Sequence, residues 1–488
     1  MEATDTHSRW PFNEDSYTSD LEHGLEIESA FSNFTSHNLS GTTSVQVLIG
    51  NSDGTIAQDE VLDERGFHST LIASHDLYDS YRFFFINRFL VDTDDTPPPD
   101  ARRLRISSSA LQYCISRLSL SPAFIHALAR YFLPAGQAFR SDLCGPDSIC
   151  DFWYFLPVRM QVRCTDQVAE HTASTAGSNQ MDPFNYLHLP DRRADIRGHQ
   201  IALYTRYNKT RNSTTLIVFD FIDGRWSRAA REPCSRLREG MGQYERLSLF
   251  EDMFSPHLVF LTSAMRWWSG AFDSLNSQLI KYERRLQDQR SPADEARIQR
   301  EANKALHAMA AHLHRYCSEL KSIANSLAAL KTYHARIYVE SEQGLAWHRL
   351  ADAFLHIESQ LTAITNFEAE LEKKIQNILA LLFNRMTQEQ TNQAQKLAWE
   401  MKIDSLSMKT IAVLTMFFLP GTSFAALLAM PFFTSNTWLS QTRRFWVWVV
   451  LTVPSTSLAF LYYLYWKKRG EGRSPDSENT IPLNDPLD

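Results

Sequence analysis

Three histidines in one predicted helix are the side chains of this sequence best suited to metal binding. His307, His312 and His314 lie in the segment 292–339, where apolar residues recur with helical spacing. Imidazole nitrogen binds zinc and other transition metals, so a metal site is one interpretation. However, His312 and His314 are two residues apart, so they point to different faces of a helix, and no acidic partner stands out. We therefore expect ordinary histidines without a role as metal ligands.

Two further groups have cation-binding side chains. Cys144, Cys150 and Cys164 are the closest group among six cysteines, but their spacing matches no zinc template. Ordinary thiols in a reducing compartment are the simpler interpretation. The segment 92–100 carries several aspartates, yet its three consecutive prolines predict a solvated loop.

Motifs of enzymes and of nucleic-acid binding are absent from the sequence. It contains no glycine-rich phosphate loop, no HExxH motif and no Gly-x-Ser-x-Gly elbow. The net charge of -7, from 49 basic and 56 acidic residues, does not favour a nucleic-acid partner. We expect neither an enzyme nor a nucleic-acid-binding protein.

Two apolar segments near the C-terminus predict membrane-spanning helices. Thr410–Thr442 and Phe445–Trp466 contain no charged residue, and only Arg443 and Arg444 separate them. About 20 apolar residues cross the roughly 30 Å of bilayer hydrocarbon. The predicted membrane part comprises a first helix over 408–433, an external loop over 434–444 and a second helix over 445–466.

Basic residues predict the orientation of these helices. Lys402 and Lys409 precede the first, and four basic residues follow the second: Lys467, Lys468, Arg469 and Arg473. The positive-inside rule then places both termini in the cytoplasm, with 467–488 as a basic cluster and disordered tail. Interfacial aromatic residues are expected near the ends of the second helix, at Trp446, Trp448, Tyr462, Tyr463, Tyr465 and Trp466.

The N-terminal composition bears on localisation. The first 30 residues carry eight acidic residues against one basic residue, Arg9. Secretory signals and mitochondrial transit peptides are basic or poor in acids. We expect the plasma membrane or an internal membrane other than the mitochondrial one.

A cytoplasmic α/β domain is predicted over 43–245, after a disordered lead-in over 1–42. Strands are predicted at Ser44–Ile49 and Phe152–Val162, and a hairpin at Ile201–Tyr207 and Thr214–Phe221 around a polar turn. A helix is predicted from Ser121-Pro122 to Phe132, with serine as its N-cap. The polar segment 165–197 reads as a surface loop.

A helical stalk is predicted over 250–407. No proline or glycine interrupts Leu345–Leu419, so one helix can run from the soluble part into the membrane. Apolar residues at alternating spacings of four and three, interrupted only by Glu368, form a seam: Leu350, Phe354, Ile357, Leu361, Ile364, Leu371, Ile375, Ile378 and Leu382. Such a seam packs against other helices or against copies of itself. We expect it to mediate parallel self-assembly.

The segment Met408–Phe432 resembles the first transmembrane helix of CorA magnesium channels. Those helices begin with Met-Lys, carry Pro-x-Thr at mid-helix and end in Gly-Met-Asn-Phe. The matching positions here are Met408, Lys409, Pro420, Thr422, Ala425, Met430 and Phe432. The basic cluster after the second helix and the order of domains also fit, and the variant motifs resemble the divergent CorA-like proteins of filamentous fungi. The resemblance implies an α+β fold class, with an N-terminal α/β domain, a long helical stalk and two C-terminal transmembrane helices in an oligomeric funnel.

The resemblance further implies five copies around one pore for divalent cations, Mg²⁺ first, with the ion as substrate and no cofactor. The implied pore-lining residues are Ser405, Met408, Ile411, Thr415, Leu419, Thr422 and Ala426. They lie three or four residues apart, on one helix face. The alternative for this face is packing within a lipid-embedded bundle. Met408, Ile411 and Leu419 would form apolar collars, and Thr415 and Thr422 would offer hydroxyl rings.

The filter motif differs from that of the family. Ala429, Met430 and Pro431 replace Gly-Met-Asn, and Pro431 has no side-chain acceptor for a hydrated ion. Backbone carbonyls of Leu427, Leu428 and Ala429 remain as candidates. We expect weak, poorly selective divalent conduction; the alternative is a non-conducting membrane scaffold or sensor.

Overall fold

The computed structural model describes residues 27–51, 55–73, 78–88, 103–132, 136–142, 148–163, 186–223, 226–242, 252–287, 292–338, 344–430 and 441–471. The chain forms two compact units, Met1–Leu382 and Phe383–Asp488. The division falls within one long helix, α9 (Leu345–Leu428).

One mixed β-sheet forms the centre of the first unit. Its strands lie in the order β2-β1-β3-β8-β7-β5-β4, and β6 pairs with β7. β3 and β8 are parallel, whereas the other pairs are antiparallel. The strands are β1 (Val45–Asn51), β2 (Ile56–Leu62), β3 (Ser80–Ile86), β4 (Gln137–Asp142), β5 (Ile149–Arg163), β6 (Leu187–Leu189), β7 (Ala194–Asn208) and β8 (Ser213–Asp220).

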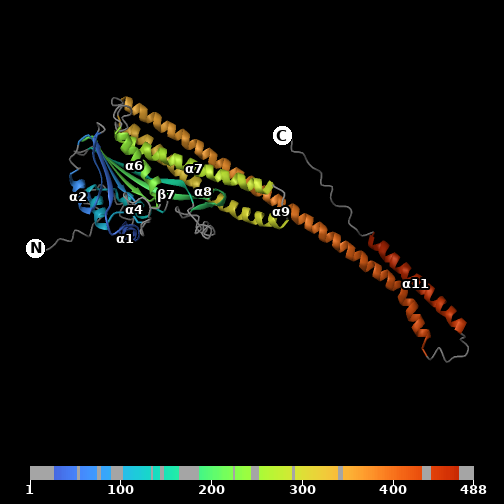
Figure 1. The fold of residues 1–488 in the computed structure, drawn as a ribbon. Coiled ribbons are helices and arrows are strands. Elements are labelled where there is room, and N and C mark those ends of the chain that lie inside the picture. The colour runs from blue at the N-terminus through green and yellow to red at the C-terminus, as the bar shows by residue number, and fades with distance from the viewer. Residues whose placement is uncertain are drawn as a thin grey trace. The chain divides into compact units, whose positions relative to one another are not determined.

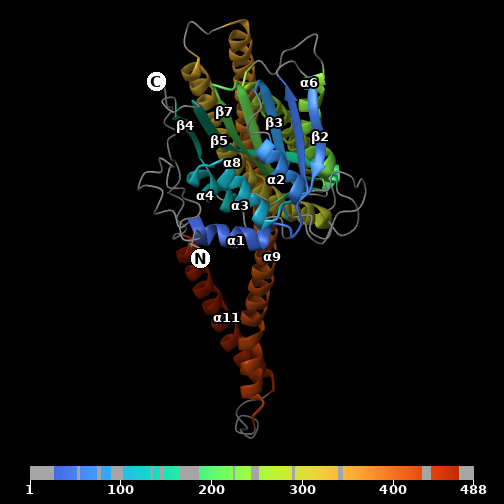
Figure 2. The same ribbon diagram turned by 90° about the vertical axis from the view of Figure 1, so that its left-hand side faces the viewer.

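Helices cover both faces of the sheet, so its central strands are buried on both sides (Figures 1 and 2). One layer contains α1 (Ile27–Asn38), α2 (Glu64–Ala73), α3 (Ser108–Arg117) and α4 (Pro122–Ala129). The other contains α6 (Ser227–Gly242), α7 (Ser255–Gln287), α8 (Pro292–Ile337) and the first part of α9. This burial explains the continuous apolar runs Phe83–Ile86 in β3 and Leu216–Phe219 in β8. The predicted mixed α/β domain followed by long helices is confirmed.

The predicted hairpin is β7 and β8, and the other two predicted strands are β1 and β5. The polar turn closes through an Asx contact, because the Asn208 Oδ1 atom accepts a hydrogen bond from the Arg211 amide at 3.0 Å. Asn212 adopts a left-handed φ of 49°, a conformation that asparagine tolerates better than most residues.

Three local predictions are wrong. The predicted disordered lead-in over 1–42 forms α1 in its described part, where Phe31 and Phe34 are buried in the core. The segment 165–197 is not a loop throughout: its described end contains β6, a short 3-10 helix at Pro190–Arg192 and the start of β7. Leu187, Leu189 and Ile196 are buried in the core, a tertiary contact that the polar composition of the segment hid. The helix after Ser121 ends at Ala129, and the Ser121 side chain makes no capping hydrogen bond.

The seam on α9 packs inside the first unit. All its residues and Glu368 are between 1% and 8% exposed within the single chain. The Phe354 ring lies 5.9 Å from His334 of α8, and the neighbouring Phe367 lies 6.4 Å from Phe272 of α7. The two alternatives for the seam are thus decided in favour of packing against other helices, and the expectation that it mediates self-assembly is wrong.

The second unit contains the rest of α9 and α11 (Gln441–Glu471). α9 remains helical through Pro420, and its ribbon changes direction in its C-terminal part (Figure 1). The predicted external loop lies largely outside the described residues, which resume at Gln441.

Candidate functional site

The two apolar helices of the second unit meet the length and composition requirements for crossing a membrane. The apolar window of α9 and the segment Phe445–Trp466 qualify, and neither is buried inside the protein. The core helix of a soluble protein would have its apolar residues covered by other parts of the chain. Here both helices present apolar side chains outwards, as expected for contact with lipid or with other helices.

A tryptophan connects the two helices. The Trp448 indole nitrogen donates a hydrogen bond to the Gly421 carbonyl at 2.9 Å. A Cβ atom at Gly421 would lie 3.5 Å from Thr452, so the helices already approach each other closely at this level. Trp448, predicted as an interfacial aromatic residue, joins α11 to α9 through this bond. Trp446 remains exposed.

The predicted pore-lining residues lie on α9 and leave one face of that helix unpacked within the chain. Met408, Ile411 and Leu419 are 69%, 63% and 65% exposed. Thr415, Thr422 and Ala426 are also exposed, and Ser405 is half-buried. We call these seven residues the candidate pore face. The single chain buries none of these seven residues, so this face is open to lipid or to another helix.

The two threonines of this face already use their hydroxyl protons. The Thr415 hydroxyl donates to the Ala412 carbonyl at 2.9 Å, and the Thr422 hydroxyl donates to the Phe418 carbonyl at 3.0 Å. A hydroxyl in this geometry retains oxygen lone pairs for accepting hydrogen bonds. Rings of such oxygens would therefore face the waters of a hydrated cation as acceptors.

The described part of the predicted filter motif, Ala429 and Met430, directly follows the last residue of α9. The Met430 amide donates to the Leu427 carbonyl at 3.2 Å, which closes the helix in a tight final turn. The Leu427 carbonyl therefore already accepts one hydrogen bond. The carbonyls of Leu428 and Ala429 are the better candidates for a ring of backbone oxygens around a cation. Pro431 lies outside the described residues.

The electrostatics of this region do not favour cations. The sequence has no Asp or Glu between Thr410 and Gly470, and Arg443 is exposed at the start of α11. Two unit charges 4 Å apart in water interact by about 1 kcal/mol, and salt screens this interaction further. The arginine therefore opposes cation approach only modestly.

The candidate metal ligands of the first unit do not assemble. Among the residues that the structure describes, no group of three or more His, Cys, Asp or Glu side chains can hold a metal ion. His312 is buried beside Tyr316, whereas His307 and His314 are exposed. Cys150 is a buried free thiol, and Cys144 and Cys164 lie outside the described residues.

Two buried polar contacts in the first unit escaped the sequence analysis. The His257 ring accepts or donates at Tyr154 (3.1 Å) and Thr205 (3.0 Å), and burial lowers its pKa to about 3, so it stays neutral at physiological pH. Arg159 of β5 forms a hydrogen-bonded ion pair with Glu319 of α8, with an Nε–Oε2 distance of 2.7 Å. Both contacts join the sheet to the helices that cover it, and we assign them a structural role.

Comparisons with known proteins give only distant likenesses. No protein-family model matches the chain, and no curated protein matches it. Among solved structures, the chain is similar to the CorA magnesium transporter from Methanocaldococcus jannaschii, with 11% identity, 86% of this chain and 96% of that chain covered, and a TM-score of 0.38.

Two further solved structures are similar at the same level. The full-length CmaX protein has 11% identity, coverage of 88% of this chain and 98% of that chain, and a TM-score of 0.40. The ZntB cytoplasmic domain from Vibrio parahaemolyticus RIMD 2210633 has 9% identity, coverage of 72% and 100%, and a TM-score of 0.34. At these identities and scores, any function assigned to this chain has to be argued from its own residues.

Proposed function

We propose that this chain is an integral membrane protein that assembles into a homo-oligomeric, CorA-like channel or transporter for divalent cations. One observation carries the proposal: the seven residues of the candidate pore face lie on one face of a helix suited to crossing a membrane, and the single chain buries none of them. Two helices per chain cannot enclose a water-filled path, so several copies must place this face inwards. The five-fold arrangement and Mg²⁺ as the first candidate ion come from the sequence resemblance, as does the fungal-type subgroup.

The arrangement of this face supports a gated path. Met408 and Ile411 lie about one helical turn apart at the start of the apolar segment, where rings of apolar side chains close a narrow path by excluding water. Thr415 and Thr422 follow at a spacing of seven residues. A hydrated cation passing the collars would then meet two rings of hydroxyl oxygens.

A non-conducting scaffold or sensor is the second candidate function. Ala429 and Met430 offer no side-chain oxygen, and no carboxylate lies between Thr410 and Gly470. Mg²⁺ gives up its waters reluctantly and needs oxygen acceptors to hold its hydration shell. We therefore propose that any conduction is slow and poorly selective.

Cation flux into liposomes that contain the purified full-length chain tests the proposal, with oligomer mass measured in the same preparation. Thr415→Cys and Leu414→Cys form a matched pair, because these neighbours project to different faces of α9. A bulky thiol reagent should block flux through the Thr415→Cys protein and spare the Leu414→Cys and unaltered proteins. An oligomer without flux would support the function of a non-conducting scaffold. Equal block of both cysteine variants would show that the candidate pore face does not line the path.

A further inference from the structure

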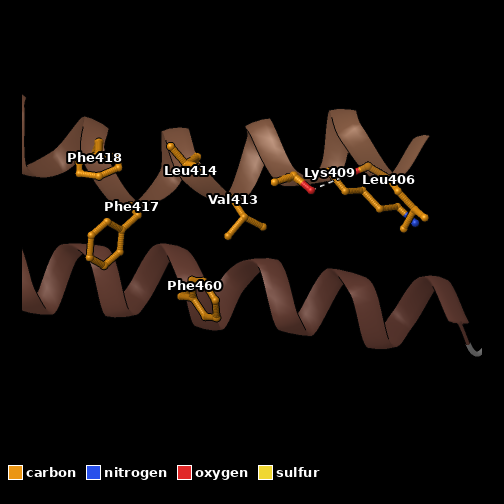
Figure 3. Close-up of a pocket in the computed structure, with 8 residues that line it drawn as sticks. Leu406, Lys409, Val413, Leu414, Phe417, Phe418 and Phe460 are labelled. Carbon is orange, nitrogen blue, oxygen red and sulfur yellow. Dashed lines mark hydrogen bonds between the residues drawn. The ribbon is translucent and has the colours of Figure 1, made fainter. Parts of the chain in front are cut away.

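A groove runs between α9 and α11 in the second unit (Figure 3). It encloses about 430 Å³, within the roughly 300–1,000 Å³ typical of ligand sites. Its lining is apolar apart from one ammonium group and one hydroxyl, and consists of Leu406, Lys409, Thr410, Val413, Leu414, Phe417, Phe418 and Phe460. The Thr410 hydroxyl donates a hydrogen bond to the Leu406 carbonyl at 2.9 Å. Lys409 is the charged residue of the lining.

The centre of the groove lies opposite the candidate pore face on α9, whereas its edges at Lys409 and Phe418 project roughly 100° and 80° away from Met408. A helix advances roughly 100° per residue, so Met408, Thr415 and Ala426 project within about 20° of one direction. Thr410, Val413 and Phe417 project about 140–200° away from it. An assembly that turns the pore face inwards therefore leaves the groove turned outwards, where the bilayer lies.

The charge in this groove is confined to one end. Figure 3 shows Leu406 and Lys409 at one end of the lining, while Phe417 and Phe418 lie at the other. α11 leaves the groove after Phe460 and continues to the exposed basic residues Lys468 and Arg469. Eight residues of helix separate Phe460 from Lys468, about 12 Å along the axis. A ligand with a long apolar part and an anionic end matches this distribution.

We propose that the groove binds an anionic phospholipid, with one acyl chain along Val413, Phe417 and Phe460 and the phosphate near Lys409. The apolar rings supply a complementary surface for hydrocarbon, and the ammonium group supplies the charge for the headgroup. Basic pockets between transmembrane helices are suited to such headgroups, whose negative surface potential attracts each basic residue. The proposal requires that the helix pair of the second unit, α9 and α11, lies in a membrane. It does not require that the protein conducts ions.

The test measures which lipids stay with the protein. The full-length chain is reconstituted in nanodiscs of equal phosphatidylglycerol and phosphatidylcholine, extracted in mild detergent, and the retained lipids are quantified by mass spectrometry. We expect phosphatidylglycerol to be enriched over phosphatidylcholine. Lys409→Gln should lower this enrichment about fivefold, the effect of one basic residue at an anionic surface.

Lys402→Gln is the matched control. Lys402 lies seven residues earlier on the same helix, outside the groove, with its ammonium 5.7 Å from the Trp399 ring. This variant should retain the wild-type enrichment. Leu414→Trp provides a second, uncharged test, because the larger side chain would fill the groove and displace the acyl chain.

Three outcomes would overturn the proposal. Equal retention of both lipids by the unaltered protein would show that the groove holds only bulk lipid. Equal loss in Lys409→Gln and Lys402→Gln would show a general charge effect. A disulfide crosslink between two copies of the Leu414→Cys protein, with no anionic enrichment, would assign the groove to a second copy. None of these readouts involves ion flux, so they stand apart from the test of the channel.

Discussion

At the scale of single residues, the candidate path has acceptors but no negative charge. Its polar groups are the hydroxyls of Thr415 and Thr422 and the carbonyls at the end of α9. Oxygen acceptors of this kind stabilise a hydrated cation without stripping its waters. Two variants test this path, one at the predicted filter motif and one at the apolar collar.

The first change concerns the filter motif. Ala429→Gly with Pro431→Asn restores the Gly-Met-Asn of the CorA family and would add a ring of amide oxygens. We expect low flux of Mg²⁺, Co²⁺ and Ni²⁺ in liposomes with the unaltered protein, and higher flux with the double variant. Fast, Mg²⁺-selective flux through the unaltered protein would show that the amide ring is dispensable.

The second change concerns the apolar collar. Met408→Ser replaces an exposed thioether with a small hydroxyl, so water should enter the constriction more readily. We expect increased leak flux in a protein shown to conduct. Leu406→Ser, on the groove side of α9, is the control and should leave the leak unchanged. Unchanged leak in Met408→Ser would exclude this residue from the gate.

At the scale of elements, α9 has two different roles along its length. Up to Leu382 its apolar seam packs against α7 and α8, whereas from Phe383 onwards none of its apolar residues is buried. Glu368 interrupts the seam: its burial, with the nearby Glu372 charge, raises its pKa, while a hydrogen bond with Cys317 opposes that shift. The seam is thus part of the core of the first unit.

Because the seam is part of the core, we predict that charged residues placed in it destabilise the first unit. Ile364→Asp with Ile375→Asp would bury two unpaired carboxylates and should destabilise the first unit by several kcal/mol. We expect a lower thermal midpoint and faster proteolysis of the full-length protein in detergent. Leu355→Asp, at a 54% exposed position of the same helix, should change neither. A double variant of normal stability that loses only its oligomeric mass would restore the seam as an assembly surface.

At the scale of the whole molecule, the two candidate membrane helices predict that both termini lie on the same side of the membrane. The positive-inside rule, applied to the basic residues before α9's apolar segment and after Phe445–Trp466, predicts that this side is the cytoplasm. In intact cells, a membrane-impermeant thiol reagent should label a cysteine at Asn436 and miss one at Ser474. Labelling of Ser474→Cys before permeabilisation would contradict this topology. Both positions lie outside the described residues.

The sequence by itself determined the features that depend on local composition and periodicity. Uncharged apolar segments predicted the two candidate membrane helices, alternation predicted the β7–β8 hairpin, and the 4-3 spacing predicted which residues of α9 are buried. These signals are local because each depends on which face of one element meets an apolar environment.

Only the tertiary structure decided which partner each of these faces meets. The spacing of Leu350 and Ile364 suits packing within one chain as well as packing between copies. In the structure these residues share a core with α7 and α8, so they pack within one chain. Likewise, the sequence shows only that Trp448 is a residue type common at membrane interfaces. The approach of α11 to α9 decides that its indole donates a hydrogen bond to the Gly421 carbonyl. The groove around Lys409 exists only because Phe460, 51 residues further along the chain, lies opposite it. Contacts between residues so far apart depend on the sum of all packing in the unit, which no local pattern encodes.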